Sequence, residues 1–148
     1  MENNEVYIEE MNKFLKGIHM GATTFKDYLE KVEDTNIKVV ILEIIESFKR
    51  HEEAITHRIE DLGGNASDSI GIGGMMGEFF EKMKLMVATN DKEILERAIK
   101  AVEMGIKQGN EFIEENMDLP KSLMNDIKGT VADYDNHLRK LQEEYKKS

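Results

Sequence analysis

Two histidines stand at matching positions in the two halves of this 148-residue chain, and they are its first candidates for chemistry. Each follows an aromatic residue by three positions, in Phe48-x-x-His51 and Tyr134-x-x-His137. An imidazole ring can bind a divalent metal when carboxylates complete the ligand set. The sequence therefore allows a mononuclear site at the two histidines. The carboxylate that would join them is Glu52, Asp133 or Glu103.

A plainer interpretation places both histidines in the hydrophobic core or at its edge. Burial keeps such rings neutral, and Tyr134, a neighbouring carboxylate or water would satisfy their nitrogens. The spacings from Glu53 to His57 and from Asp133 to His137 are i,i+4, but on charged helices such pairs usually lie on the surface. The sequence alone leaves both interpretations open.

The composition excludes several other kinds of chemistry. The chain has no cysteine, so disulfides, thiolate metal sites and cysteine nucleophiles are absent. A net charge of −10 argues against nucleic acids and anionic membrane surfaces as partners. The glycine-rich stretch GIGGMMG follows no predicted strand and lacks the lysine of a phosphate-binding loop. The N-terminus does not resemble a signal peptide and no apolar run reaches about 20 residues, so we expect a cytoplasmic protein.

Hydrophobic periodicity predicts four long helices that would position these side chains. Apolar residues recur at steps of three and four over 4–32, 36–62 and 91–116, and from Pro120 to about residue 145. Gly63-Gly64 is typical of a helix C-terminus, because glycine readily adopts the left-handed conformation there. Asn90 and Glu93 have the spacing of a capping box at the start of the third long helix.

The segment between the second and third long helices is interpreted as a crossover. It carries a short amphipathic helix over about 75–87, which either packs on the bundle or forms a surface for a homodimer or protein partner. The side chains expected on that surface are Phe79, Phe80, Met83 and Met86. The fold class is therefore all-α: one domain of residues 1–148 with a helical hairpin at 4–62, a crossover at 63–89 and a second hairpin at 90–147.

The two hairpins repeat each other in sequence. A shift of 84 aligns Met20-Gly21 with Met104-Gly105, and a shift of 86 aligns Phe48 with Tyr134 and His51 with His137. The difference of two residues can be absorbed in the hairpin loops. Any two amphipathic helices align to some degree, but the shared Met-Gly and aromatic-x-x-His features favour a true internal repeat.

This layout resembles the ferritin-like superfamily of four-helix bundles. The segment FKRHEEAI is similar to the second-helix ligand segment of rubrerythrins, and the whole layout is most similar to small, uncharacterised bacterial ferritin-like proteins. In active members, the first and third helices each supply a Glu, and the second and fourth each supply Glu-x-x-His. The resemblance therefore implies a diiron centre in the middle of the bundle.

Carried onto this sequence, the implied carboxylate positions hold other residues. The helix-one and helix-three positions match Ala22 and Ile106, and the Glu of each Glu-x-x-His is replaced by Phe48 and Tyr134. His51 and His137 remain as vestigial ligands. Two neutral imidazoles cannot balance two irons, which prefer oxygen ligands, whereas apolar side chains would gain burial energy at the same place.

We therefore expect a non-enzymatic ferritin-like protein with a degenerate diiron site and no cofactor. Its role would be structural, partner-binding or stress-associated, with a dimer as one form. The alternative is a metal-binding or oxidoreductase protein that holds iron or another divalent metal at His51 and His137. A third hypothesis is an apolar ligand pocket in the former metal cavity, where Ala22 and the glycines leave space.

Overall fold

The computed structural model describes residues 2–67 and 90–148, and within these ranges the chain forms four long α-helices and no strand. Their bounds lie within about two residues of the predicted ranges. The short helix predicted over 75–87, with its Phe79, Phe80, Met83 and Met86, lies outside the described residues. The four helices are α1 (Glu2–Lys31), α2 (Thr35–Asp61), α4 (Asp91–Glu115) and α5 (Lys121–Lys147).

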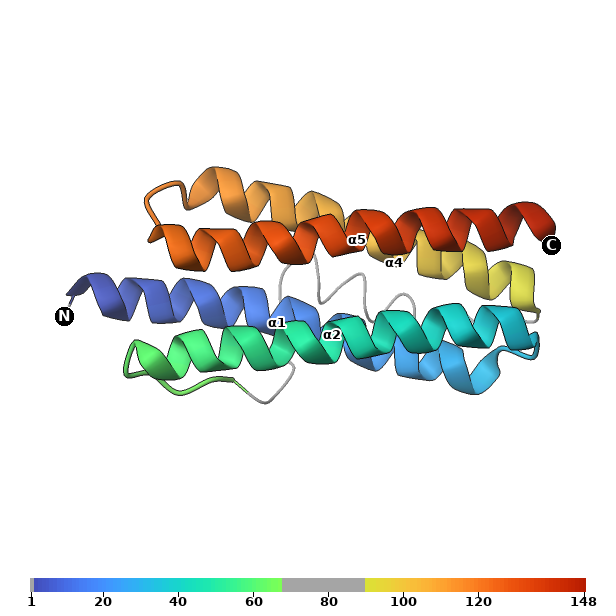
Figure 1. Cartoon of the computed structure of the whole chain (residues 1–148), viewed down its shortest axis with the longest axis horizontal. Coiled ribbons are helices and arrows are strands. Elements are labelled where there is room, and N and C mark those ends of the chain that lie inside the picture. Colours follow the sequence, from blue (N-terminus) through green and yellow to red (C-terminus); the bar gives the residue numbers. More distant parts are fainter. Residues whose placement is uncertain (1, 68–89) are drawn as a thin grey trace.

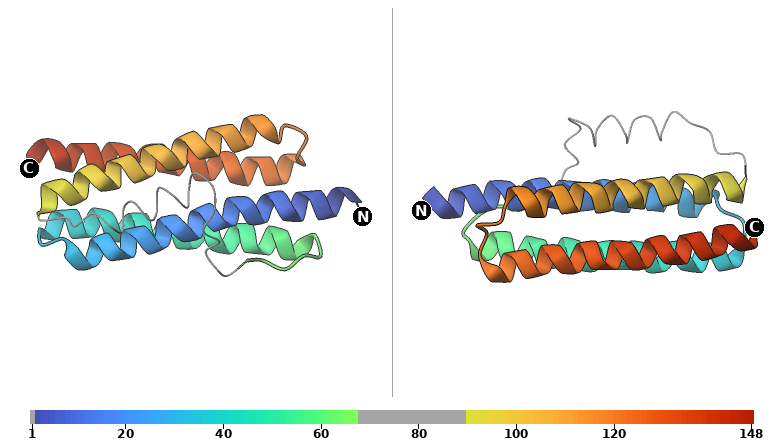
Figure 2. Two further views of the ribbon diagram at one scale, coloured as in Figure 1. Left: turned by 180° about the vertical axis from the view of Figure 1, so that it is seen from behind. Right: turned by 90° about the horizontal axis from the view of Figure 1, so that it is seen from above.

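The helices form two antiparallel hairpins that lie side by side (Figure 1). One hairpin consists of α1 and α2, and the other of α4 and α5. Figure 2 shows α1 beside α4 in one layer and α2 beside α5 in the other. Because α2 ends at the end of the bundle opposite to the start of α4, the connection between the hairpins must span the bundle length (Figure 1). This confirms the predicted all-α four-helix bundle with one long crossover.

The ends of α2 are set by two residues with specialised local chemistry. Asp34 is extended and its Oδ1 accepts a hydrogen bond from the Ile37 amide at 3.0 Å, which satisfies one of the free donors at the helix start. At the other end, Gly63 has a φ of +89°. The Gly64 amide then donates to the Ile59 carbonyl at 3.0 Å, in the pattern of a glycine-terminated helix. The predicted C-terminal role of the two glycines is therefore correct.

The third long helix begins as its sequence predicts. Asn90 Oδ1 accepts from the Glu93 amide at 2.9 Å. The next residue, Asp91, also reaches the other hairpin, because its two carboxylate oxygens accept from the Glu33 and Asp34 amides at 2.9 Å each. One short segment thus starts α4 and fixes the turn between α1 and α2.

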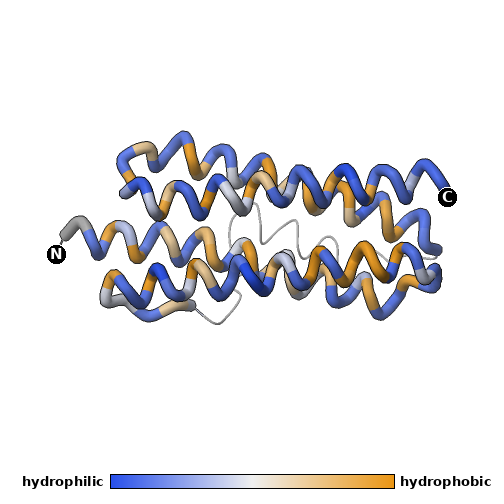
Figure 3. The backbone as a smooth tube through the Cα atoms, viewed as in Figure 1, coloured by the Kyte–Doolittle hydropathy of each residue, from blue (hydrophilic) through white to orange (hydrophobic). Residues whose placement is uncertain are grey.

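A single apolar core runs along the length of the bundle. Hydrophobic residues recur about once per turn along every helix (Figure 3), as expected for helices that bury one face. Burial of each large side chain contributes about 1.5–3 kcal/mol to folding. The largest fully buried side chains are Met11, Leu15, Ile18, Phe25, Ile41, Ile44, Ile55, Ile59, Ile94, Leu95, Ile127 and Leu141.

Candidate functional site

Two aromatic rings from opposite hairpins meet at the middle of the bundle. Phe48 of α2 and Tyr134 of α5 are both buried, with ring centroids 5.6 Å apart. The Phe25 ring lies a further 5.6 Å from Phe48. Burial raises the pKa of the Tyr134 hydroxyl well above its usual value, so the phenol stays protonated and neutral. The middle of the bundle therefore holds a chain of uncharged rings.

Each of these two rings packs on a glycine of its own hairpin. A Cβ added at Gly21 of α1 would lie 2.9 Å from the Phe48 ring, and one added at Gly105 of α4 would lie 3.4 Å from the Tyr134 ring. The two contacts are equivalent under the internal repeat, because Gly21 aligns with Gly105 and Phe48 aligns with Tyr134. The sequence did not predict that these glycines make room for the two rings, although the repeated Met-Gly pair was a signal for it.

The two residues that follow these glycines differ in burial. Ala22 is 3% exposed and belongs to the core, while Ile106 is partly buried and packs against it. Both are apolar, like the aromatic residues in the other two implied ligand positions. That these four positions once held carboxylates stays a prediction. As they stand, Ala22, Phe48, Ile106 and Tyr134 offer no carboxylate to a metal.

His137 lies beside the two central rings and is 7% exposed. Its ring centroid is 6.2 Å from that of Phe48 and 6.4 Å from that of Tyr134. Neither ring nitrogen has a hydrogen-bond partner among the described residues. Burial lowers the pKa of His137 to about 4, although the nearby Asp133 carboxylate acts in the opposite direction. The ring is therefore neutral at pH 7.

His51 is held between two residues of α5. Its Nε2 lies 2.7 Å from Asp133 Oδ2, and its Nδ1 lies 3.2 Å from Thr130 Oγ1. Hydroxyl, imidazole and carboxylate are the groups of a nucleophilic triad, but Thr130 is fully buried and its hydroxyl donates to the Asp126 carbonyl at 2.9 Å. A substrate cannot reach that oxygen, so this set joins α2 to α5 rather than forming a reactive centre.

The remaining candidate carboxylates do not lie with the two histidines. Glu52 contacts His19 Nδ1 of α1, whose Nε2 lies 2.7 Å from the Ser67 carbonyl oxygen. Glu103 is exposed. Across the described ranges, no three His, Asp or Glu side chains are placed to hold one metal ion. The donor set at the middle of the bundle therefore does not fit a diiron centre, which needs several carboxylates.

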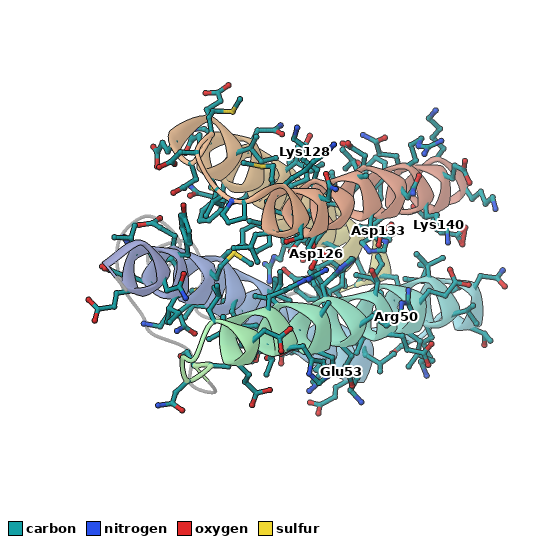
Figure 4. The ribbon with its side chains drawn as sticks, turned by 60° about the vertical axis from the view of Figure 1, so that its left-hand side comes forward. Arg50, Glu53, Asp126, Lys128, Asp133 and Lys140 are labelled. Carbon is teal, nitrogen blue, oxygen red and sulfur yellow. The ribbon has the colours of Figure 1, made fainter. Side chains whose placement is uncertain are left out.

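A surface pocket of about 260 Å³ lies between α2 and α5, next to this centre. It is lined by His137 and by Ser47, whose buried hydroxyl also has no partner among the described side chains. Arg50 of α2 and Lys140 of α5 lie at its rim (Figure 4). Glu43 and Glu46 lie there as well, and Lys140 pairs with Glu43 at 2.9 Å. Charges of both signs therefore surround the opening.

The two helical hairpins, packed side by side, have the ferritin-like four-helix fold. Residues 6–115 match the family described as "Domain of unknown function (DUF2383)", and the chain belongs to that family. No curated protein matches it. None of the described helices combines the length and the apolar character that crossing a bilayer requires.

Two solved structures share the fold across nearly the whole chain. One is described as ferritin-like, diiron-carboxylate proteins from Bacillus anthracis str. Ames; it is 18% identical, with a TM-score of 0.72 over 98% of this chain and 99% of that one. The other is the bacterioferritin-related protein from Bacteroides fragilis, described as a dodecameric thioferritin. It is 15% identical, with a TM-score of 0.75 over 95% of this chain and 84% of that one. At such identities the likeness establishes the fold alone.

Proposed function

We propose that this protein is a non-enzymatic member of the ferritin-like superfamily whose bundle centre is filled by packed rings instead of a diiron site. Its role is structural, partner-binding or stress-associated, in the cytoplasm, and residues 1–148 act as one domain. The observation that carries the proposal is the contact of Phe48 with Tyr134 at the position where the resemblance implies metal-binding carboxylates. A phenol that stays protonated and a phenylalanine ring supply no negative charge to a metal.

The proposal is tested by the metal content of protein purified without a histidine tag. The protein is incubated with Fe(II), Mn(II) or Zn(II), desalted, and analysed by mass spectrometry of the elements. We expect far less than one ion per chain for each metal. The alternative, a metal site at His51 and His137, predicts about one ion per chain that is lost in the double variant His51→Ala/His137→Ala.

A matched control separates specific binding from surface binding. His57 is exposed and lies on the same helix as His51, so His57→Ala removes an imidazole without touching the bundle centre. Stoichiometric metal that survives His57→Ala but not the double variant would overturn the proposal.

We propose that the protein acts by self-association or by binding a protein partner. The Bacteroides fragilis structure is described as dodecameric, and a segment rich in Phe and Met would supply adaptable apolar contacts. The change Phe79→Ser or Phe80→Ser should alter the mass measured by sedimentation while circular dichroism stays the same. An unchanged mass in both variants would remove self-association from the proposal, and Val6→Ser, at an exposed residue of α1, serves as the control.

A further inference from the structure

A small cavity lies beside the central rings, on the side where α1 and α4 face each other. Its volume is about 40 Å³. It exists because glycines stand where larger residues would fill the space: a Cβ added at Gly17 would meet no atom within 4 Å. The lining residues are Gly17, Met20, Gly21, Thr24, Phe25, Phe48, Ala101, Val102, Gly105 and Tyr134.

The walls of this cavity carry no charge and few polar groups. The Thr24 hydroxyl already donates to the Met20 carbonyl at 2.8 Å, and Tyr134 stays neutral because burial raises its pKa. A buried water needs about two to four polar partners, and apolar cavities that lack them stay dry and take up apolar molecules. The chemistry of the walls therefore disfavours water and ions and favours an uncharged apolar guest.

The cavity adjoins a groove on the surface of the bundle. The groove has a volume of about 440 Å³, runs between α1 and α4, and shares Gly17, Gly105 and Tyr134 with the cavity. The rings of Phe14 and Phe112, with centroids 5.1 Å apart, line it further along. Within the part of the chain that the structure describes, the groove therefore leads from the surface to residues that also line the cavity.

We propose that this cavity is a binding site for one small, uncharged, apolar molecule of a few heavy atoms. The size limit follows from the volume, because about 40 Å³ is well below the roughly 150 Å³ of an apolar cavity that takes up benzene. Gly17 and Gly105 keep the site open, and the Phe48 and Tyr134 rings form its inner wall. This site goes beyond the proposed function, since it requires neither the presence nor the absence of a metal.

Xenon is the probe for this site, because it is apolar, of suitable size and visible both in crystals and by NMR. Crystals of the full chain are exposed to xenon gas, and ¹²⁹Xe NMR measures binding in solution. We expect one xenon atom at the cavity, next to Gly17, Gly105 and Tyr134. Absence of xenon from this cavity, or xenon found only elsewhere, would overturn the proposal.

Filling the cavity tests the assignment further. Gly17→Val places a branched side chain in the open space and should lower the xenon affinity at least about tenfold. Gly129→Val is the matched control, because Gly129 is also a helical glycine with nothing within 4 Å of an added Cβ, but is exposed on α5 away from the cavity. If Gly17→Val does not fold, Ala101→Val carries the same expectation. Equal binding in the filled and control variants would refute the site.

Discussion

The glycine at position 21 illustrates how one absent side chain shapes the middle of the bundle. Its Cα faces the Phe48 ring, and that ring is held by Phe25, Tyr134 and His137 at centroid distances of 5.6–6.2 Å. Because three rings pack against it, the Phe48 ring must shift against its neighbours to admit a methyl group at position 21. The equivalent glycine in the other hairpin, Gly105, leaves more room because the added Cβ would lie at ordinary contact distance from Tyr134.

The change Gly21→Ala should therefore destabilise the protein. Overpacking against Phe48 costs about 1–3 kcal/mol, which outweighs a gain in helix propensity of up to about 1 kcal/mol. We expect a net loss of about 1–2 kcal/mol in the free energy of unfolding, measured with urea. Gly129→Ala, where the added Cβ meets nothing, should instead gain up to about 1 kcal/mol. A stabilised Gly21→Ala would show that the Phe48 ring moves freely.

His137 offers a second prediction at the residue scale. Its two ring nitrogens are buried without partners, and replacing such a group by an apolar one of similar size is neutral or stabilising. His137→Leu should raise the free energy of unfolding at pH 7 by about 1–2 kcal/mol. His57→Leu, at an exposed residue, should change it by less than about 0.5 kcal/mol. A marked loss of stability in His137→Leu alone would mean that the imidazole has a bound partner in solution.

The same histidine predicts a pH dependence of stability. Burial lowers its pKa in the folded protein from 6.5 to about 4, so between these values the unfolded chain binds a proton that the folded chain does not. Above pH 6.5 the ring is neutral in both states, and the free energy of unfolding then falls as the pH drops from 6.5 towards 4. At 1.36 kcal/mol per pH unit, the loss is about 3 kcal/mol. The stability advantage of His137→Leu should grow by that amount over this interval, and a constant difference would contradict the lowered pKa.

The residues of the centre could be predicted only in part from the sequence. The pattern Phe48-x-x-His51 and Tyr134-x-x-His137 predicts paired positions in the two hairpins, and the rings of Phe48 and Tyr134 lie 5.6 Å apart. The partners of these side chains were not predictable, because a hydrogen bond between helices depends on how far each helix is rotated about its axis. Asp133 has i,i+4 spacing to His137 but bonds to His51 across the interface.

Among the elements, α2 and α5 are joined by a row of polar pairs. Glu43 meets Lys140, His51 meets Asp133, and Arg58 meets Asp126, so the pairs follow the antiparallel course of the two helices. The three α5 partners, Asp126, Asp133 and Lys140, follow one another along that helix in Figure 4. Pairs that solvent can reach contribute little free energy, about 0–1 kcal/mol each. Their alignment matters for register, because a shift by one turn would break all of them together.

Helix bounds were the part of the fold that the sequence predicted best. Apolar periodicity and the helix-end signals at Asn90 and Gly63 depend only on neighbouring residues. They can therefore be recognised from the sequence without knowing the tertiary contacts. The contact between the start of α4 and the turn before α2 is different, since Asp91 and Asp34 are 57 residues apart. Nothing local to either segment indicates that contact.

Loss of the Asp91 side chain should weaken the contact between the start of α4 and the α1–α2 turn. Its carboxylate accepts hydrogen bonds from two backbone amides of the α1–α2 turn and lies in the first turn of α4, where negative charge is favourable. Asp91→Ala should lower the free energy of unfolding by about 1–2 kcal/mol. Asp91→Asn should lower it by a smaller amount. Asp118→Ala, at an exposed residue of the loop before α5, should have almost no effect. Equal effects of Asp91→Ala and Asp118→Ala on the free energy of unfolding would show that the hydrogen bonds of Asp91 do not stabilise the contact between the hairpins.

At the scale of the whole molecule, the dominant electrostatic property is the excess of acidic residues. The chain carries 30 Asp and Glu against 20 Lys and Arg, which gives a net charge of −10. Such a charge opposes the compact state through self-repulsion. Dissolved salt weakens that repulsion, because the screening length falls from about 30 Å at 0.01 M to about 8 Å at 0.15 M. The same salt also weakens the surface ion pairs, but these contribute little.

Stability should therefore rise with ionic strength in the dilute range. We expect a higher Tm at 0.15 M than at 0.01 M NaCl, measured by circular dichroism at pH 7. The triple variant Glu53→Gln/Glu114→Gln/Glu143→Gln changes three exposed acidic residues and reduces the net charge from −10 to −7. Its Tm should depend less on salt than that of the unchanged protein, because less repulsion remains to be screened. A Tm that falls with salt would mean that the attractive pairs between helices, such as Arg58 with Asp126, outweigh the repulsion between like charges.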